Sequence, residues 1–419
     1  MDTAADNVDE LESFRQRARS FVRNNLSAAD PDHPSDLSLA EAKLLQATIF
    51  DAGLAGIAVP RAYGGAGLSL AHQEVWAEEV EGYVVPTPLF VSMGMLGITL
   101  LEHGSETLKK RHLPRILRGE EVWLQLLSEP SGGSDMAGVI TRASRDGETW
   151  IVNGAKMWST GAAEADYGMC LARTDWDAPK HRGLSMFAMP LKDPQVTIEP
   201  IVGIDGGPAH FFQEFFDEVS LPLDHLIGVE NEGWSVAHTL LFHERNATAG
   251  VGHGLGLGGG REGSGGGGAD SHGVEDLVRY AGLSRSLTDP AIRQLIAEAY
   301  VADRARHHAN DRVTVGMRTG AFKGDWGSLL KLGLALDTLR RAEIAISVAG
   351  ADGVIWGDES PGAGSVAGRA WLNARSISIA GGTNEMQRNI VSERLLGLPR
   401  EPAADRDAPF SEVIRRRDR

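Results

Sequence analysis

The sequence predicts an α+β protein made of three consecutive parts: a helical N-terminal domain, a middle domain of β-strands and a helical C-terminal domain. Over residues 1–120, and again over residues 233–419, apolar residues recur at the three- and four-residue spacing of amphipathic helices. Over residues 121–232 the pattern changes to short apolar runs bounded by Gly, Pro and Asp, which is typical of strands. A succession of helix, strand and helix favours three packed units over a doubly wound α/β sheet.

The N-terminal domain begins with a predicted amphipathic helix over residues 7–25, where Val8, Leu11 and Phe14 fall on one face. Residues 27–38 are rich in Asp, Pro and Ser and are predicted to form a loop. Further helices, separated by Gly and Pro, are predicted over residues 38–52, 69–80, 89–103 and 105–118.

The middle domain is predicted to be an antiparallel β-sandwich or barrel, because its apolar runs are short, numerous and separated by turn residues. The first run, residues 123–127, leads into a loop of Ser, Glu, Pro and Gly at residues 128–134. The other predicted strands cover residues 150–153, 167–173, 184–190, 196–200 and 211–219.

The C-terminal domain is predicted to resemble a four-helix bundle, with helices over residues 235–248, 290–313, 327–349 and 364–379. A glycine-rich stretch within residues 250–270 interrupts these helices and is predicted to be a mobile loop, because its apolar content cannot offset the entropy of ordering. Gly254, Gly256 and Gly259 have the GxGxxG spacing of a dinucleotide-binding loop. That interpretation is rejected, since the motif needs a strand before it and a helix at its end, whereas here a helix precedes it and more glycine follows.

The composition restricts the class of partner and the compartment. The 419 residues carry a formal net charge of −16, which disfavours binding to nucleic acid or to an anionic membrane. Cys170 is the only cysteine, so an intrachain disulfide is excluded and a reducing compartment is favoured. The N-terminus is acidic and no apolar run reaches 18 residues, so neither a signal peptide nor a membrane span is expected. We expect a cytoplasmic protein.

The loop at residues 128–134 and the strand that ends near residue 160 have the composition of a binding site. Gly132 and Gly133 allow a ligand to approach the backbone closely. Directional hydrogen bonds and a flat aromatic face are available from Ser128, Ser134, Thr160 and Trp158. This set predicts a planar cofactor with polar edges. The alternative is that Ser128 and Thr160 cap turns and that Trp158 belongs to the core.

At these residues the chain resembles the acyl-CoA dehydrogenase family of flavoproteins. SEPSGGSD (residues 128–135) is similar to the family's TEPxAGSD-like loop, and NGAKMWSTG (residues 153–161) is similar to its NGxKxWIT-like strand. Residues 53–67, 214–234 and 381–400 are similar to the family's opening segment, its passage into the C-terminal helices and its C-terminal signature. The resemblance spans roughly residues 45–400, with the motifs in the family's order.

The resemblance implies an FAD cofactor and assigns residues to it. Around the flavin it places Gln125, Leu127, Ser128, Gly133, Ser134, Trp158 and Thr160. In the GGTNE loop it assigns Gly382, Thr383 and Glu385 to the cofactor, the alternative being a plain turn with Asn384 as helix cap. Arg279 corresponds to a basic residue that reaches a neighbouring subunit's cofactor, the alternative being a solvated arginine. Ser134 and Arg245 are assigned to the substrate, and no metal site is predicted.

The catalytic base departs from the commonest pattern of the family. Many members carry a glutamate in a YEGT sequence, but here Gly381 stands before Gly382 and Thr383. A subset of the family, including isovaleryl-CoA and long-chain dehydrogenases, takes the base from an ER dipeptide on an earlier helix, which corresponds to Glu244 and Arg245. Val236 and Leu240 share a helix face with Glu244, so its carboxylate is predicted to point inward. The alternatives are an ion pair between Glu244 and Arg245 and, with less support, a titrating His243.

The resemblance therefore implies FAD-dependent α,β-dehydrogenation of an acyl-CoA thioester to a trans-2-enoyl-CoA, with a branched or bulky acyl group. Electrons are expected to pass to an electron-transfer flavoprotein or a similar acceptor. Two alternatives stay open: a flavin oxidase or monooxygenase on the same fold, and a catalytically silent partner subunit. The expected assembly is a homodimer, a homotetramer or a heterotetramer with a related subunit.

Overall fold

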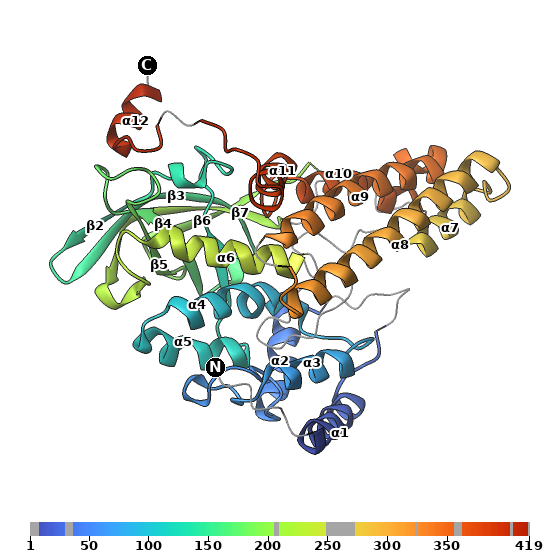
Figure 1. Cartoon of the computed structure of the whole chain (residues 1–419), viewed down its shortest axis with the longest axis horizontal. Helices are drawn as coiled ribbons and strands as arrows, with labels where there is room; N and C mark the ends of the chain where they lie inside the picture. The colour runs from blue at the N-terminus through green and yellow to red at the C-terminus, as the bar shows by residue number, and fades with distance from the viewer. Residues whose placement is uncertain are drawn as a thin grey trace.

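The computed structural model describes residues 8–29, 37–204, 209–248, 273–322, 325–355, 363–402 and 405–417. A helical first part, a sheet and a set of long helices form three regions that meet near the centre of the molecule (Figure 1). The predicted fold class is therefore confirmed. The predicted mobile loop within residues 250–270 lies outside the described residues.

The helices of the first part agree closely with the predicted ones, with one exception. They are α1 (Val8–Asn25), α2 (Leu39–Asp51), α3 (Leu70–Glu79), α4 (Gly97–His103) and α5 (Glu106–Arg118). A single helix was predicted over residues 89–103, but a π-helical turn, η3 (Ser92–Leu96), precedes α4. The Ser92 hydroxyl donates to the Trp123 carbonyl at 2.9 Å and accepts from the Trp123 amide at 2.7 Å. The turn thus ties the first part to the start of the sheet.

In the described part of the chain, eight strands form one sheet with the order β6-β7-β3-β2-β4-β5-β8, and β1 pairs with β4. The strands are β1 (Trp123–Leu126), β2 (Arg142–Asp146), β3 (Thr149–Thr160), β4 (Tyr167–Arg173), β5 (Leu184–Pro190), β6 (Val196–Ile201), β7 (Phe211–Pro222) and β8 (Leu226–Ile227). β1 and β4 are parallel, as is the single contact between β2 and β4, so the sheet is mixed and not wholly antiparallel as predicted. β8 was not predicted, and β3 joins the predicted run at residues 150–153 and the predicted strand that ends near residue 160 into one strand.

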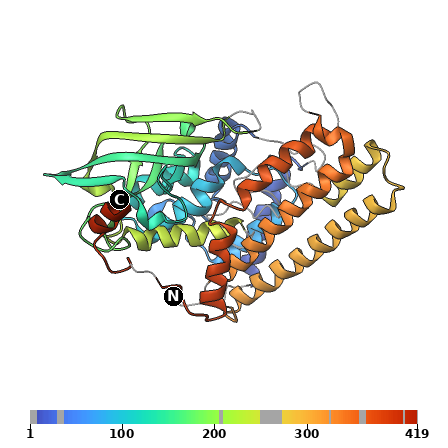
Figure 2. The ribbon, with the colours of Figure 1, turned by 90° about the horizontal axis from the view of Figure 1, so that it is seen from above.

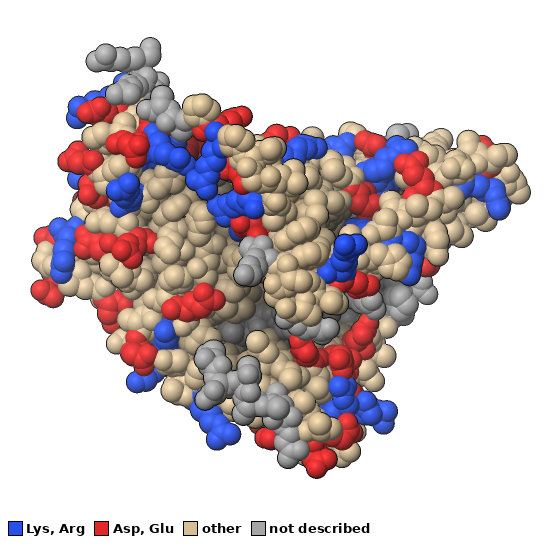
Figure 3. Space-filling view, in the orientation of Figure 1, with Lys and Arg blue, Asp and Glu red and all other residues tan. Residues whose placement is uncertain are grey.

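The last part contains α6 (Gly233–Thr248), α7 (Val274–Leu283), α8 (Pro290–Arg318), α9 (Trp326–Ala349), α10 (Ala363–Ile377), α11 (Asn384–Ile390) and α12 (Phe410–Arg417). α7 to α10 pack together into the long helical region seen in Figure 2. α6 was predicted as part of the bundle, but it lies against the sheet, and α7, α11 and α12 were not predicted. On the face shown in Figure 3, acidic and basic side chains are interspersed.

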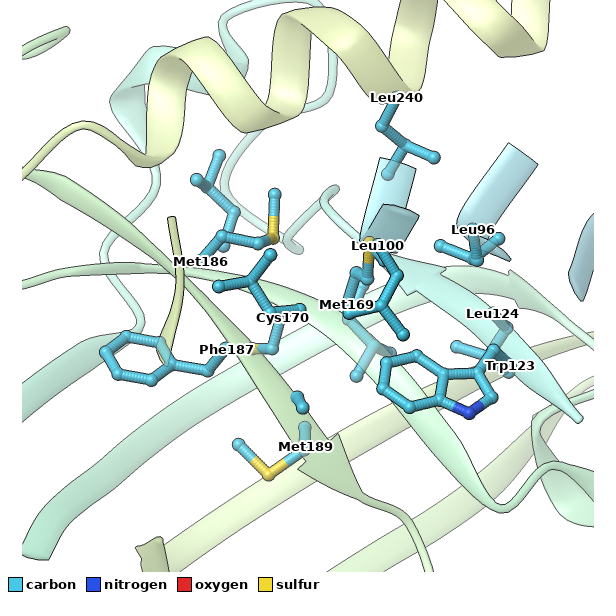
Figure 4. Packing of buried hydrophobic residues seen from close by; sticks show 14 of the residues in the cluster. Leu96, Leu100, Trp123, Leu124, Met169, Cys170, Met186, Phe187, Met189 and Leu240 are labelled. Atoms are coloured by element: carbon cyan, nitrogen blue, oxygen red, sulfur yellow. The ribbon is translucent and has the colours of Figure 1, made fainter. Parts of the chain in front are cut away.

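The largest apolar core joins the sheet to α4, α5 and α6. In Figure 4, Leu240 extends from α6 toward buried residues of the sheet, among them Met169 and Cys170. Burial raises the pKa of the Cys170 thiol to about 12, so this cysteine is an apolar core residue and not a nucleophile. Among the described residues, no helix is both long and apolar enough to cross a membrane.

Glu214 is a carboxylic acid inside the middle of the sheet. It lies on β7 opposite Lys156 of β3 and is fully buried. Oε1 accepts a hydrogen bond from the Ser159 hydroxyl, whereas Oε2 has no hydrogen-bond partner among the described residues. Burial raises the pKa of Glu214 to about 7, although Ser159 and the charge of Lys156 act in the opposite direction. Ionisation of this group at neutral pH therefore costs stability.

Replacing Glu214 by Gln is expected to make the protein more stable above pH 7. Because the folded-state pKa lies above the ordinary value of 4.5, Glu214 contributes most below pH 4.5, and its contribution falls as the pH rises to about 7. The total change is of the order of 1–3 kcal/mol. Urea unfolding at several pH values measures it. A difference between wild type and variant that does not change between pH 5 and 8 would contradict the assignment.

Candidate active site

Glu244 lies on the face of α6 that packs against the sheet. Val236 and Leu240 on the same face are buried in the main core, and Glu244 is only 8% exposed. A surface ion pair between Glu244 and Arg245 requires an accessible carboxylate, so the surface form of that alternative is excluded. The inward orientation predicted from the helical spacing is therefore correct.

Two other segments of the chain meet the Glu244 carboxylate. The Gln125 side chain on β1 hydrogen-bonds to it. The Gly381 backbone approaches so closely that a Cβ at this position would lie 3.4 Å from Glu244 Oε1. Gly381 is the position at which the commonest family pattern carries its glutamate. In this chain the Glu244 carboxylate, which comes from α6, lies beside that position.

Lys331 of α9 fixes the Gly381–Gly382 turn beside this carboxylate. Its buried ammonium group donates to the carbonyl oxygens of Ile377 at 2.7 Å and Gly382 at 2.9 Å. Gly381 has φ +66° and Gly382 has φ +90°, values that favour glycine. The sequence interpretation missed Lys331. The signal was present, since it is a single cation in the apolar run from Leu329 to Leu336.

Burial is the largest influence on the pKa values of Glu244 and Lys331. It raises the pKa of Glu244, while the hydrogen bond from Gln125 and the charges of Arg245 and Lys331 act to lower it. Burial also lowers the pKa of Lys331 to about 8, and the Glu244 charge opposes that shift. A carboxylate whose pKa is raised is a stronger base than an exposed glutamate.

Arg245, the predicted substrate residue, follows Glu244 on α6 but has a different partner. Its guanidinium group lies 3.6 Å from the Asp325 carboxylate, which also pairs with Arg394 at 2.9 Å. Burial lowers the pKa of Arg245, and the charges of Asp325 and Glu244 act against this. Arg245 is therefore held in an ion-pair cluster with Asp325 and Arg394, next to Glu244 on α6.

A buried ion pair between Glu129 and Lys156 fixes the start of the loop at residues 128–134. Lys156 Nζ lies 2.8 Å from Glu129 Oε1, and both side chains are almost completely buried. Glu129 also accepts the amides of Ile140 at 2.7 Å and Thr141 at 2.9 Å, while Lys156 donates to the Leu127 carbonyl at 3.2 Å. Burial acts to raise the pKa of Glu129, but the charge of Lys156 and these hydrogen bonds hold it below its ordinary value. The sequence interpretation missed both residues, although both lie inside the quoted motifs.

Trp158 is displayed at the surface by a β-bulge. The pairing of β3 with β7 shifts between Met157 and Ser159, and Trp158 has φ +69°, which is rare for a bulky residue. Trp158 is 55% exposed, and its ring meets the Phe211 ring edge-on with 6.1 Å between the ring centroids. The alternative of a core tryptophan is therefore wrong. The bulge leaves an aromatic face available to a planar ligand.

The structure brings Trp158 close to the predicted loop. The Met157 amide donates to the Ser128 carbonyl at 3.0 Å. A Cβ on Gly133 would lie 3.6 Å from Ser128 Oγ, so the loop folds back over its own start. Thr160, at the end of β3, and Ser134 are both exposed.

In the GGTNE loop, Thr383 and not Asn384 is the cap of α11: its hydroxyl accepts the Met386 amide at 3.2 Å. The Asn384 side chain is buried and donates to Ser378 at 3.2 Å. Glu385 is exposed and lies 3.6 Å from Arg388.

Arg279 is not part of this constellation. It lies on α7, which Figure 1 shows at the far end of the helical region from the sheet. It is exposed, pairs with Asp276 at 2.5 Å and lies over the ring of Tyr280 at 5.5 Å. The described residues contain no group of three His, Cys, Asp or Glu side chains suited to a metal ion.

Comparison with known families gives three consecutive matches. Residues 8–120 match the model described as acyl-CoA dehydrogenase, N-terminal domain. Residues 125–216 match the middle domain, and residues 270–396 match the C-terminal domain, of the same family.

Individual relatives match along nearly the whole chain. Acyl-CoA dehydrogenase IpdE1 of Mycobacterium tuberculosis (strain ATCC 25618 / H37Rv) is 32% identical over 403 residues, covering 94% of this chain and 99% of the relative. Among solved structures, the Tcur3481-Tcur3483 steroid ACAD is 28% identical with a TM-score of 0.73, covering 96% of this chain and all of that chain. The ChsE4-ChsE5 complex from Mycobacterium tuberculosis matches with a TM-score of 0.69 and 22% identity, covering 95% of this chain and 100% of the matched chain. This similarity shows a common fold.

Proposed function

Because the chain belongs to the acyl-CoA dehydrogenase family, we propose that it is an FAD-dependent enzyme that converts an acyl-CoA thioester to the trans-2-enoyl-CoA. The observation that carries the proposal is the buried Glu244 carboxylate, held between Gln125 of the sheet and the Gly381–Gly382 turn. Removal of a proton beside a carbonyl requires a positioned base with a raised pKa. Glu244 meets both conditions.

The aromatic and polar side chains of the site fit FAD. Trp158 offers an exposed aromatic face, and the exposed Thr160 and partly exposed Ser128 offer hydroxyl groups on the adjoining loop and strand. Gln125 Oε1 is buried and has no hydrogen-bond partner in the described part of the chain, so this amide oxygen can accept a further hydrogen bond beside Glu244. We assign the ring system to these residues with Leu127, Gly133 and Ser134, and the remainder of the cofactor to Gly382, Thr383 and Glu385. Arg279 is retained as a contact across a subunit interface.

When bound, FAD supplies the acceptor for the hydride that leaves the substrate β-carbon. Glu244 takes the α-proton onto its carboxylate. The Gln125 hydrogen bond holds that carboxylate in one orientation, and Lys331 keeps the neighbouring turn in place through two carbonyl groups. Ser134 and Arg245 are proposed to bind the thioester end of the substrate.

We propose a branched or bulky acyl group as the substrate class. The position of the base on α6 supports this, as does the similarity to a structure described as a steroid ACAD. The electron acceptor is proposed to be an electron-transfer flavoprotein. The similar structure whose title names two proteins, the Tcur3481-Tcur3483 steroid ACAD, supports a heteromeric assembly with a related subunit over a homodimer or homotetramer. The single buried cysteine favours a cytoplasmic location.

Anaerobic titration of the purified protein with straight, branched and steroid-derived acyl-CoA thioesters tests the proposal. We expect a yellow protein whose flavin absorbance is bleached most strongly by the bulky thioesters. A colourless protein that does not bind added FAD would instead identify a silent partner subunit. Rapid reoxidation of the substrate-reduced protein by air would identify an oxidase.

Replacing Lys331 by Met is expected to raise the apparent pKa for flavin reduction. The ammonium charge favours the ionised form of Glu244, so its removal makes the carboxylate harder to ionise and lowers the rate on the acidic side of the profile. Because the pKa of Lys331 is about 8, the difference between the profiles that comes from its charge should vanish above pH 8, whereas a loss of rate from the two missing hydrogen bonds to the turn should not depend on pH.

Stopped-flow reduction from pH 5.5 to 9 measures this shift. Lys192→Met is the matched control, since Lys192 forms an exposed ion pair with Asp166 in the middle part. An identical pH profile for wild type and Lys331→Met would show that Lys331 has no electrostatic influence on the base.

A further inference from the structure

The C-terminal segment, residues 405–417, lies beyond residue 396, where the family match ends, and packs against the loop between β4 and β5. Figures 1 and 2 both place α12 beside the sheet and away from the helical bundle. The amide of Phe410 donates to the Ala178 carbonyl at 3.0 Å, and that of Ser411 donates to the Trp176 carbonyl at 2.8 Å. Phe410 is completely buried. This segment, which we name the strap, is therefore seated on the loop between β4 and β5.

Arg173 connects the strap to the candidate site. Its buried guanidinium carbon lies 3.6 Å from the centroid of the Phe410 ring. The same group donates to the carbonyl oxygens of Ala137 at 2.6 Å and Val139 at 3.2 Å. Burial lowers the pKa of Arg173 to about 10, so it stays charged at neutral pH and depends on these partners. Loss of the Phe410 ring would expose one side of it.

A second connection runs through Lys180 on the same β4–β5 loop. Its ammonium group lies 3.1 Å from Asp135 and 3.5 Å from Asp405 of the strap. Asp135 directly follows Ser134, the last residue of the candidate binding loop. Lys180 and Arg173 thus both act on the stretch 135–139, and each is itself held by a strap residue.

We propose that the strap is a positioning element that holds the far end of the 128–134 loop in its binding conformation, with Phe410 as its anchor. The near end of the loop is fixed inside the sheet by Glu129 and Lys156. The far end is fixed by Arg173 and Lys180, whose positions depend on Phe410 and Asp405. The consequence for substrate binding rests on the proposed function, whereas the mechanical coupling does not.

Hydrogen exchange followed by mass spectrometry tests the coupling in Phe410→Ala, with Arg415→Ala, on the exposed face of α12, as the control. We expect about tenfold faster exchange over residues 128–141 and 174–183 in Phe410→Ala, and wild-type rates in the control. Lys180→Met, which removes both bridges but leaves Phe410 seated, should affect residues 128–141 alone. Wild-type exchange over residues 128–141 while residues 405–417 are detached would overturn the proposal.

Steady-state kinetics with the best thioester separates positioning from general loss of stability. We expect Phe410→Ala to weaken FAD binding and, in enzyme saturated with FAD, to raise the KM for the thioester about tenfold with kcat within about threefold of wild type, because the loop binds and does not react. Phe410→Leu, which keeps an apolar anchor, should recover most of this loss. Equal KM values in wild type and Phe410→Ala would contradict positioning. If no thioester reacts with the wild type, the proposed function fails while the exchange result still decides the role of the strap.

Discussion

Replacing Glu244 by Gln is expected to lower the rate of substrate-dependent flavin reduction by about 10³-fold or more, which is the scale of a lost general base. Glutamine preserves the shape of the side chain and its ability to hydrogen-bond to Gln125, but it cannot accept the α-proton. Because Glu244 is not among the proposed FAD ligands, the variant should remain yellow. Anaerobic stopped-flow absorbance measures the reduction, and flavin fluorescence measures retention of the cofactor.

Glu393→Gln is a matched control for this experiment. Glu393 lies in the chain's second ER dipeptide and pairs with Arg400 at 3.3 Å. Since it belongs to the C-terminal helical turn, its substitution should leave reduction within about twofold to threefold of wild type. Unchanged bleaching in Glu244→Gln would show that another group is the base.

A double substitution tests whether the location of the carboxylate in the site, and not the helix or loop that carries it, determines activity. A side chain at Gly381 would begin 3.4 Å from Glu244 Oε1. Glu244→Gly combined with Gly381→Glu should therefore restore part of the activity. Restoration will be incomplete, because a non-glycine residue at φ +66° is strained by about 1–3 kcal/mol. Gly381→Glu alone should be inactive, since two carboxylates would then compete for one site.

Replacing Lys156 by Met is expected to destabilise the protein by about 3–5 kcal/mol, because it leaves the Glu129 carboxylate buried without its counter-charge. Lys156 and Glu129 are 0% and 2% exposed, so water cannot replace the lost partner. The 128–134 loop should also lose its fixed base, and FAD affinity should fall with it. Urea unfolding monitored by tryptophan fluorescence measures the stability change.

The control for this prediction is Lys192→Met. Lys192 pairs with Asp166 at the surface, and its side chain is 69% exposed. Loss of such a pair costs at most about 1 kcal/mol. The double variant Lys156→Met with Glu129→Gln should be more stable than Lys156→Met, because no buried charge is left unpaired. Equal destabilisation by the two single lysine substitutions would contradict a buried ion pair.

The local pattern of the sequence determined the order of helical and strand segments and the inward face of α6. Apolar spacing reports which side of an element is buried, so it placed Glu244 correctly beside Val236 and Leu240. Turn residues likewise located the loop at residues 128–134. These features depend on residues only a few positions apart.

The partners of each element were decided by the tertiary structure. Gln125, Glu244, Lys331 and Gly381 are far apart in the sequence, and no periodicity shows that they meet. The parallel pairing of β1 with β4, the exposure of Trp158 at a bulge and the docking of Phe410 on Arg173 likewise depend on contacts between distant segments. Local spacing fixes the direction in which a side chain points, whereas the group that it meets depends on how the whole chain packs.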